Sequence, residues 1–349
     1  MIKKRNLDNS LIQWIMTQTG LGPGIGELFW VAPAASSTSQ FRTQLQRWGV
    51  EQSYKIYTLP SLAKADMVAN RNDVMLVMPG KYTEPVTISW NKSQTHILGL
   101  GGPQTAVPVG VTNPSYYLEI GNPASGGAAT GVYVLDVTGE YCQFINLSIQ
   151  NLFNSSACLG AVKVRGEGNY FKNVNMVGGT AATPAATDKS CSLEIGDDAG
   201  CSRFDDCNIG TPHGTVRSSA SNGALYFSGV ARRSPRGWFN RCNFYVRSNT
   251  SAASIIRDDG CDRSWIFNDC YFENFSDNYG TALAECIHEN AFATTHAFVF
   301  RRCTLVGVTV WCTNQSGYPH YTLSDMPAAD TGGGIVRALE GTVFVGSDR

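Results

Sequence analysis

Two acidic turns are the stretches of this sequence whose residue types and spacing best suit catalysis. They read DDAGC at 197–201 and DDGC at 258–261. If they lie two coils apart in a stacked fold, their carboxylates are roughly 10 Å apart, because neighbouring strands are about 4.8 Å apart. An inverting glycosidase holds its acid and its base about 6.5–9.5 Å apart. The expected separation lies just beyond this range, which makes the geometry marginal, and Asp198 and Asp259 are the candidate catalytic pair.

A second interpretation assigns the same residues to turns, because Asp and Gly suit turn geometry. We favour it and assign no catalytic residue. We also predict no cofactor and no metal site: the sequence has no CxxC, its cysteine count of 11 is odd, and its five histidines are scattered.

One six-residue pattern occurs six times along the chain. It consists of Phe, two mostly polar residues, Cys or an aliphatic residue, one further residue and a last apolar residue. The phenylalanines lie 27–35 residues apart. Repeats of this length are typical of solenoids, in which each repeat buries its apolar side against its neighbours. The six segments are FINLSI at 144–149, FKNVNM at 171–176, FDDCNI at 204–209, FNRCNF at 239–244, FNDCYF at 267–272 and FRRCTL at 300–305.

Each repeat is predicted to be one coil of short strands. Its last apolar residues alternate as in a strand with one buried side, and the polar pair after Phe fits a bend. A second short strand precedes several repeats, as in AVKVRG at 161–166 and ALYFSG at 224–229. Stacked coils of this kind form long parallel sheets, so the sequence predicts an all-β parallel β-helix.

The cysteines follow the repeat. Its fourth place holds Cys207, Cys242, Cys270, Cys303, Leu147 and Val174. A place that accepts Cys, Leu or Val is an interior place, since free Cys behaves as a small buried hydrophobe. We expect a stack of reduced cysteines, with disulfides or a metal as the alternatives, and synthesis in a reducing cytoplasm.

The start of the repeat region resembles a known family. Residues 59–69 are predicted to form a short amphipathic helix, and DVMLVMPG is a strand that ends at Pro79 and Gly80, followed by Tyr82. This order resembles the opening of right-handed parallel β-helix proteins of the pectate-lyase-like type. A helix at this place covers the apolar side chains and open strand edges at the end of the first coil. The resemblance covers about residues 58–102, and the coil pattern extends the predicted β-helix domain to residues 58–349.

Residues 1–57 do not repeat and are interpreted as an N-terminal arm for attachment. LIQWIMTQTG at 11–20 is apolar, and GELFWV further along supplies a strand. A soluble enzyme gains little from an apolar arm, whereas a protein in an assembly can order it against a partner. The net charge of −1 gives no attraction for nucleic acid or an acidic membrane, and no run is long enough to span a membrane.

These features together look like a bacteriophage virion protein. We expect a structural capsid decoration protein without catalytic activity, located in the virion, synthesised in the host cytoplasm and bound to other virion proteins through residues 1–57. We also expect a homo-oligomer, with a trimer as one option. The alternative is a tailspike that binds or cleaves host polysaccharide as a glycoside hydrolase or polysaccharide lyase.

The cysteine stack gives a first testable prediction. Replacement of Cys270 with Ser should destabilise the fold by roughly 1–3 kcal/mol, because a hydroxyl is then buried without an assured partner. Cys270→Val should cost less, because Val174 already fills the same place. Urea unfolding of the two variants checks this order, and mass spectrometry that finds two of the four cysteines linked by a disulfide contradicts it.

Overall fold

The protein is described by a computed structural model. It describes residues 26–33, 56–103, 117–121, 133–179, 181–211, 216–217, 223–228, 236–248, 250–251, 253–261, 264–275, 282–289, 298–312, 321–323, 327–328 and 336–337. The parts 1–25 and 34–55 of the predicted arm, including LIQWIMTQTG, lie outside these residues.

Most of the described residues belong to two parallel sheets, here called sheet A and sheet B. Sheet A contains β1 (Leu28–Val31), β2 (Ile56–Tyr57), β3 (Asp73–Val77), β4 (Gly80–Thr83), β6 (Thr95–Gly99), β7 (Gly102–Pro103), β8 (Tyr117–Gly121), β10 (Gln143–Gln150), β12 (Tyr170–Val177), β14 (Arg203–Asp205), β15 (Asn208–Gly210), β17 (Arg236–Asn240), β18 (Asn243–Val246), β20 (Ser264–Asn268), β21 (Tyr271–Asn274), β23 (Phe298–Arg301), β24 (Thr304–Val306) and β26 (Tyr321–Leu323).

Sheet B contains β5 (Ile88–Trp90), β9 (Leu135–Val137), β11 (Val162–Val164), β13 (Leu193–Ile195), β16 (Leu225–Phe227), β19 (Ile256–Asp258), β22 (Leu283–Glu289) and β25 (Val308–Cys312). Two short helices, α3 (Pro60–Asp66) and α4 (Ala182–Ala185), and the antiparallel pair β27 (Pro327–Ala328) and β28 (Val336–Arg337) complete the described elements.

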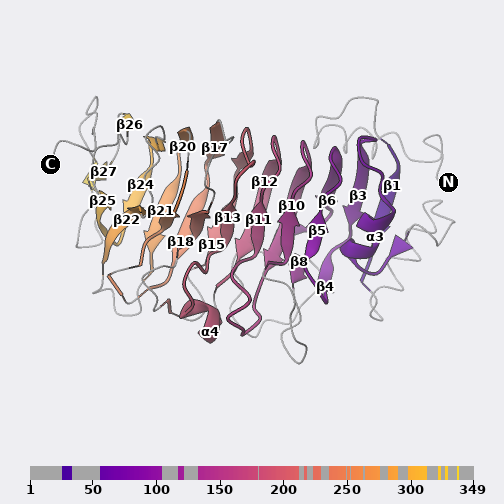
Figure 1. Ribbon diagram of the computed structural model, residues 1–349, viewed down its shortest axis with the longest axis horizontal. Helices are drawn as coiled ribbons and strands as arrows, with labels where there is room; N and C mark the ends of the chain where they lie inside the picture. The colour runs from indigo at the N-terminus through magenta and orange to yellow at the C-terminus, as the bar shows by residue number, and fades with distance from the viewer. Residues whose placement is uncertain are drawn as a thin grey trace.

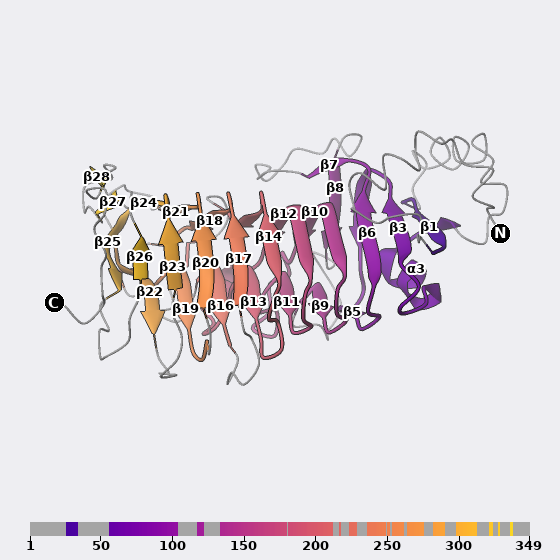
Figure 2. The same cartoon turned by 90° about the horizontal axis from the view of Figure 1, so that it is seen from above.

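Successive coils stack in register along the long axis. In sheet A, β10 pairs with β12 and β12 with β14, all in parallel. In sheet B, β11 pairs with β13 and β13 with β16 in the same way. Figure 1 shows the coils side by side from the N-terminal end to the C-terminal end, and Figure 2 shows sheets A and B as separate rows of strands. The predicted right-handed parallel β-helix is confirmed.

The repeated phenylalanines form one continuous stack inside the solenoid. Neighbouring rings lie 4.6, 4.8, 4.6, 5.0 and 4.8 Å apart between centroids, and their planes differ by at most 15°. The six rings are at most 1% exposed. This spacing is that of neighbouring strands. One sequence repeat is therefore one coil of the solenoid, after which the next phenylalanine stacks on the previous one. The stack consists of Phe144, Phe171, Phe204, Phe239, Phe267 and Phe300.

The polar pair after each phenylalanine forms the predicted bend. Its second residue has a positive φ of 50–57° in all six repeats, namely Asn146, Asn173, Asp206, Arg241, Asp269 and Arg302. This left-handed conformation is uncommon for residues other than Gly, and Asn and Asp adopt it most readily. The bend turns the chain between strands such as β14 and β15, which lie on either side of Asp206.

The predicted cysteine stack is confirmed. Cys207, Cys242, Cys270 and Cys303 are free thiols and at most 2% exposed. The Sγ atom of Cys270 lies 3.4 Å from the carbonyl oxygens of Phe239 and Asn268. The thiols therefore lie beside backbone carbonyls in addition to filling the core, a contact that the sequence pattern did not indicate.

The predicted capping helix is present but shorter than residues 59–69. It ends at Asp66 because Met67 has an extended backbone, with φ −63° and ψ 152°. Ala63 and Met67 are buried in the core that contains the first coils. The backbone N–H of Ser61 donates to Glu84 Oε1 over 3.0 Å, which satisfies one of the N–H groups left open at a helix start.

The turn that follows β3 accounts for the Pro-Gly-x-Tyr sequence. Gly80 has a φ of 149°, and a Cβ there would lie 2.3 Å from Cγ of Pro33. The Tyr82 hydroxyl is buried and donates to the carbonyl oxygens of Met78 and Val31 at 2.7 and 3.2 Å. Gly gives the chain room to turn, and Tyr82 ties the turn to β1.

The sheet begins before residue 58. Strand β1 lies in the stretch assigned to the arm, yet it pairs in parallel with β3. Its residues Phe29, Trp30 and Val31 are at most 1% exposed, so this apolar stretch is buried within the chain itself. A role of residues 1–57 in attachment stays a prediction. No described helix is long and apolar enough to cross a membrane.

The phenylalanine stack generates a second testable prediction. Phe239 contacts the rings of Phe204 and Phe267 on its two sides. Phe239→Ala should lower the free energy of unfolding by roughly 3–5 kcal/mol, because it leaves a cavity in the middle of the stack. Leu62→Ala on α3, where the side chain is 50% exposed, is the control and should change it by less than about 0.5 kcal/mol. Equal losses in urea unfolding would contradict the structural role of the stack.

Candidate functional site

The outer face of sheet B carries a row of ionisable side chains, here called the sheet B row. In strands such as β11 and β13 the first and third residues are buried in the core. Because side chains alternate along a strand, the middle residues point outward. Strand pairing places them side by side in the order Asp136, Lys163, Glu194, Tyr226, Arg257 and His288.

Two carboxylates lie close together near the middle of the row, and the first of them is Glu194, whose side chain is 5% exposed. It lies 2.5 Å from Nζ of Lys163 and accepts hydrogen bonds from the hydroxyl groups of Tyr133 and Ser228. Burial and the nearby charge of Glu194 raise the pKa of Tyr133. Tyr133 therefore stays protonated and acts as a donor.

The second carboxylate is Asp259, which follows β19 and is 14% exposed. Its Oδ1 lies 2.9 Å from Nε of Arg257, and its Oδ2 accepts a 2.9 Å bond from the Tyr226 hydroxyl and lies 3.3 Å from Nζ of Lys189. Burial acts to raise the pKa of Asp259, but Tyr226 and Arg257 outweigh it and lower the pKa below its usual value. Asp259 is therefore ionised at neutral pH.

Tyr226 connects the two carboxylates. It pairs with Glu194 across neighbouring strands and donates to Asp259. Burial, followed by the bond to Asp259, raises the pKa of Tyr226. The cluster thus contains an ionised carboxylate, a protonated hydroxyl and cations. These are the groups that general-base or nucleophilic attack and stabilisation of a developing oxyanion require.

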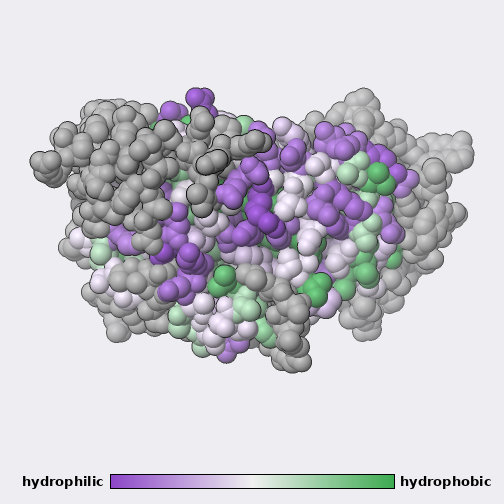
Figure 3. All heavy atoms as spheres, viewed as in Figure 1, coloured by the Kyte–Doolittle hydropathy of each residue, from purple (hydrophilic) through white to green (hydrophobic). Residues whose placement is uncertain are grey.

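Solvent reaches this cluster mainly from its cationic side. The side chain of Lys189 is 52% exposed and that of Lys163 is 26% exposed, whereas that of Arg257 is only 6% exposed. Arg165, at 45% exposure, pairs with Asp136 at the edge of the row. Figure 3 shows hydrophilic surface across the middle of the molecule.

The structure separates the two aspartates that the sequence paired. Asp259 belongs to the cluster, but Asp198 is an exposed residue beyond β13. Strand pairing sets Asp258 level with Ile195, so Asp198 lies two residues further along its coil than Asp259. Asp258 accepts bonds from the N–H groups of Gly260 and Cys261 at 3.0 and 2.7 Å. A turn-forming role therefore fits Asp258. The sequence prediction, which assigned no catalytic residue and named Asp198 and Asp259 only as candidates, stays untested.

Sequence reasoning missed most members of the cluster. The available signal was a polar middle residue in otherwise apolar triplets, as in VKV at 162–164 and LEI at 193–195. That signal does not indicate which coils are neighbours. Among the described residues no group of three or more His, Cys, Asp or Glu side chains is arranged to hold a metal ion.

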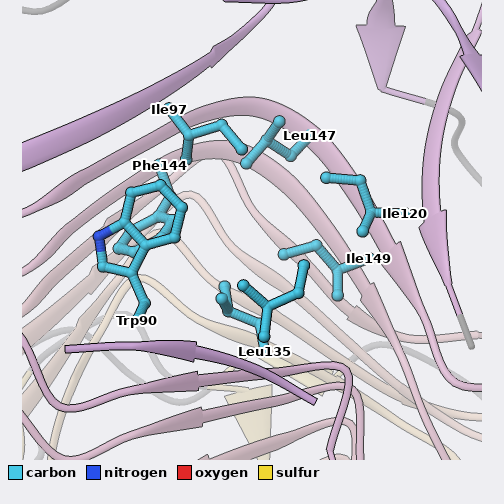
Figure 4. Close-up of a pocket in the computed structure, with 8 residues that line it drawn as sticks. Trp90, Ile97, Ile120, Leu135, Phe144, Leu147 and Ile149 are labelled. Carbon is cyan, nitrogen blue, oxygen red and sulfur yellow. The ribbon is translucent and has the colours of Figure 1, made fainter. Parts of the chain in front are cut away.

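A small pocket near the N-terminal coils is a different kind of feature. Figure 4 shows side chains from both sheets pointing toward one another around it. Every lining residue is apolar and buried, so the pocket is a packing gap in the core. It is lined by Ile88, Trp90, Ile97, Ile120, Leu135, Phe144, Leu147 and Ile149.

Comparison with solved structures identifies enzymes that share this fold. A pectin methylesterase in complex with a hexasaccharide is 14% identical and aligns with a TM-score of 0.50 over 89% of this chain and 85% of that chain. Pectin methylesterase PemA from Erwinia chrysanthemi is 15% identical, with a TM-score of 0.47 over 90% and 86% of the two chains. The rice weevil pectin methyl esterase is 15% identical, with a TM-score of 0.47 over 94% of each chain.

No protein-family model matches the chain, and no curated protein matches its sequence. The fold of the described residues, together with the similarity to the pectin methylesterase structure, defines the class as the right-handed parallel β-helix.

The expectation of a non-catalytic structural protein of a phage particle is wrong. The solved structure that aligns with a TM-score of 0.50 is an enzyme, a pectin methylesterase in complex with a hexasaccharide, and nothing in the comparisons indicates a phage. The expectation depended on fold analogy and on the apolar arm. Part of that arm, Phe29 to Val31, is used in the core of the chain itself.

The ion cluster generates a third testable prediction. Asp259→Asn should lower the free energy of unfolding by about 1–3 kcal/mol, because the buried guanidinium of Arg257 loses its charged partner. Asp198→Asn, at an exposed site, should change it by less than about 0.5 kcal/mol. Chemical unfolding of both variants at neutral pH measures the difference.

The difference in the free energy of unfolding between wild type and Asp259→Asn should become smaller as the pH falls. The folded-state pKa of Asp259 lies below its usual value, so its ion pairs stabilise the fold above the unfolded-state pKa of about 4. That stabilisation is lost as the pH falls through the folded-state pKa. A gap between wild type and Asp259→Asn that widens as the pH falls below about 4 would contradict the assignment.

Proposed function

We propose that this chain is a carbohydrate-active protein that hydrolyses ester groups on a polysaccharide held along the outer face of sheet B. The observation that carries the proposal is the pair of carboxylates Glu194, in the sheet B row, and Asp259, beside it, each held among cations and hydroxyl donors. The fold is also that of the pectin methylesterase bound to a hexasaccharide, with a TM-score of 0.50.

The shape of the row suits an extended ligand. Its members repeat once per coil, at about the 4.8 Å spacing of neighbouring strands, and a polysaccharide is itself a linear repeat. Lys163 in the row and Lys189 beside it have 26% and 52% of their side chains accessible. They can pair with acidic groups of a sugar chain while the carboxylates lie beneath them.

Ester hydrolysis assigns a role to each group at the second carboxylate. Asp259, which is ionised, is the nucleophile or the base that activates water, and the ester carbonyl becomes an oxyanion during attack. Tyr226 and Lys189 contact Asp259 in the free protein. At least one of them must turn to the substrate oxygen, and Lys189 is the more accessible.

The fourth testable prediction concerns this activity. The wild-type protein, incubated with methyl-esterified or acetylated polygalacturonate, should release methanol or acetate. Asp259→Asn should lower kcat/KM by at least about 100-fold through loss of the base or nucleophile. Tyr226→Phe should also lower kcat/KM, because Asp259 loses the hydroxyl that donates to its Oδ2.

Glu140→Gln is the matched control, because it makes the same acid-to-amide change at an exposed side chain. It should keep kcat/KM within about twofold of wild type. Absence of ester hydrolysis by the wild type on both polymers, or full activity in Asp259→Asn, would overturn the proposal.

A further inference from the structure

The bends of sheet A carry an exposed row of alternating charges, here called the charge row. It consists of Asp206, Arg241, Asp269 and Arg302, one residue from each of four successive coils. Their neighbours Asp205, Asn240, Asn268 and Arg301 pair in register between strands β14, β17, β20 and β23. The row therefore advances by about 4.8 Å per residue, with the signs minus, plus, minus, plus.

The charges are paired along the row but remain open to solvent. Nε of Arg241 lies 2.7 Å from Oδ1 of Asp206, and Nε of Arg302 lies 2.6 Å from Oδ1 of Asp269. The arginine side chains are 56% and 60% exposed, and both aspartates are 41% exposed. Their outer sides are therefore accessible to a second set of charges.

The charge row is complementary in sign to the charge row of a second copy that runs in the opposite direction. When two copies meet with antiparallel long axes, Asp206 faces Arg302 of the second copy and Arg241 faces Asp269 of the second copy. The twofold axis passes between Arg241 and Asp269, and all four positions meet an opposite charge at once because both rows share one spacing. We propose that the charge row is an isologous contact through which two copies of this chain associate.

The symmetry of the row favours a dimer over the trimer considered from the sequence. A threefold arrangement brings a surface against a different surface, so it does not use the self-complementary order of these charges. The bends lie within sheet A, between strands such as β14 and β15, so the contact leaves the outer face of sheet B accessible. The inference does not depend on the proposed ester hydrolysis.

The association should be weak and sensitive to salt. Exposed ion pairs contribute little each, and charges are screened over about 10 Å at 0.1 M ionic strength. Sedimentation equilibrium of the full chain at low salt should show a monomer–dimer equilibrium whose Kd rises at least about tenfold in 0.5 M NaCl. A salt-independent dimer, a trimer, or a monomer at every concentration up to about 1 mM would overturn the proposal.

Two charge-swapped variants test the pairing without removing the ion pairs within the chain. Asp206→Arg with Arg241→Asp gives the order plus, minus, minus, plus, and Asp269→Arg with Arg302→Asp gives minus, plus, plus, minus. In each variant the pairs 206–241 and 269–302 stay opposite in charge, and the net charge is unchanged. Antiparallel self-association now brings like charges together, so each variant alone should be monomeric.

A mixture of the two variants gives the decisive measurement. Their rows are complementary when antiparallel, so the mixture should form heterodimers with a Kd within about threefold of the wild-type dimer. Thermal melting of each variant verifies that it is folded. Dimerisation of either variant alone, or no association in the mixture, would show that the charge row is not the contact.

Discussion

The structure depends on one constraint, the in-register stacking of parallel coils. Each coil brings every residue to within about 4.8 Å of its counterpart in the next coil, so a place in the repeat becomes a continuous row through the molecule. Inside the solenoid such a row must be filled by side chains that pack on copies of themselves. Phe meets this requirement by parallel stacking, as between Phe144 and Phe171, and Cys meets it because it is small and lies beside backbone carbonyls.

The same constraint acts on charges at the surface. Like charges at this spacing repel, so a row of ionisable residues is stable only when signs alternate or when neutral donors lie between them. The bends of sheet A show the first arrangement in Asp206, Arg241, Asp269 and Arg302. The outer face of sheet B shows both, because Asp136, Lys163 and Glu194 alternate in sign. The neutral Tyr226 then pairs with Glu194 and donates to Asp259, so it separates two like charges. Both potential contact surfaces are thus products of the stacking that also builds the core.

Stacking explains why the fold alone did not reveal a function. The interior rows satisfy the requirements of any β-helix, and pectin methylesterases share the architecture at 14% identity. The proposed function therefore uses outward-facing residues that the core does not require, Glu194 and Asp259. The virion interpretation lacked such residues and relied on an apolar segment, part of which is buried as strand β1.

The sequence by itself determined the class of fold, the interior place of the cysteines and the bends. These places hold similar residue types in every coil, so they are visible as a repeat in the sequence. The sheet B row is not visible in this way: its members change from Lys to Glu, Tyr and Arg, and only strand pairing shows that they are neighbours. Tyr133 and Lys189 reach the carboxylates from outside the paired strands. The two-residue offset between Asp198 and Asp259 was likewise decided by tertiary structure, because coils of unequal length bring unequal positions into register.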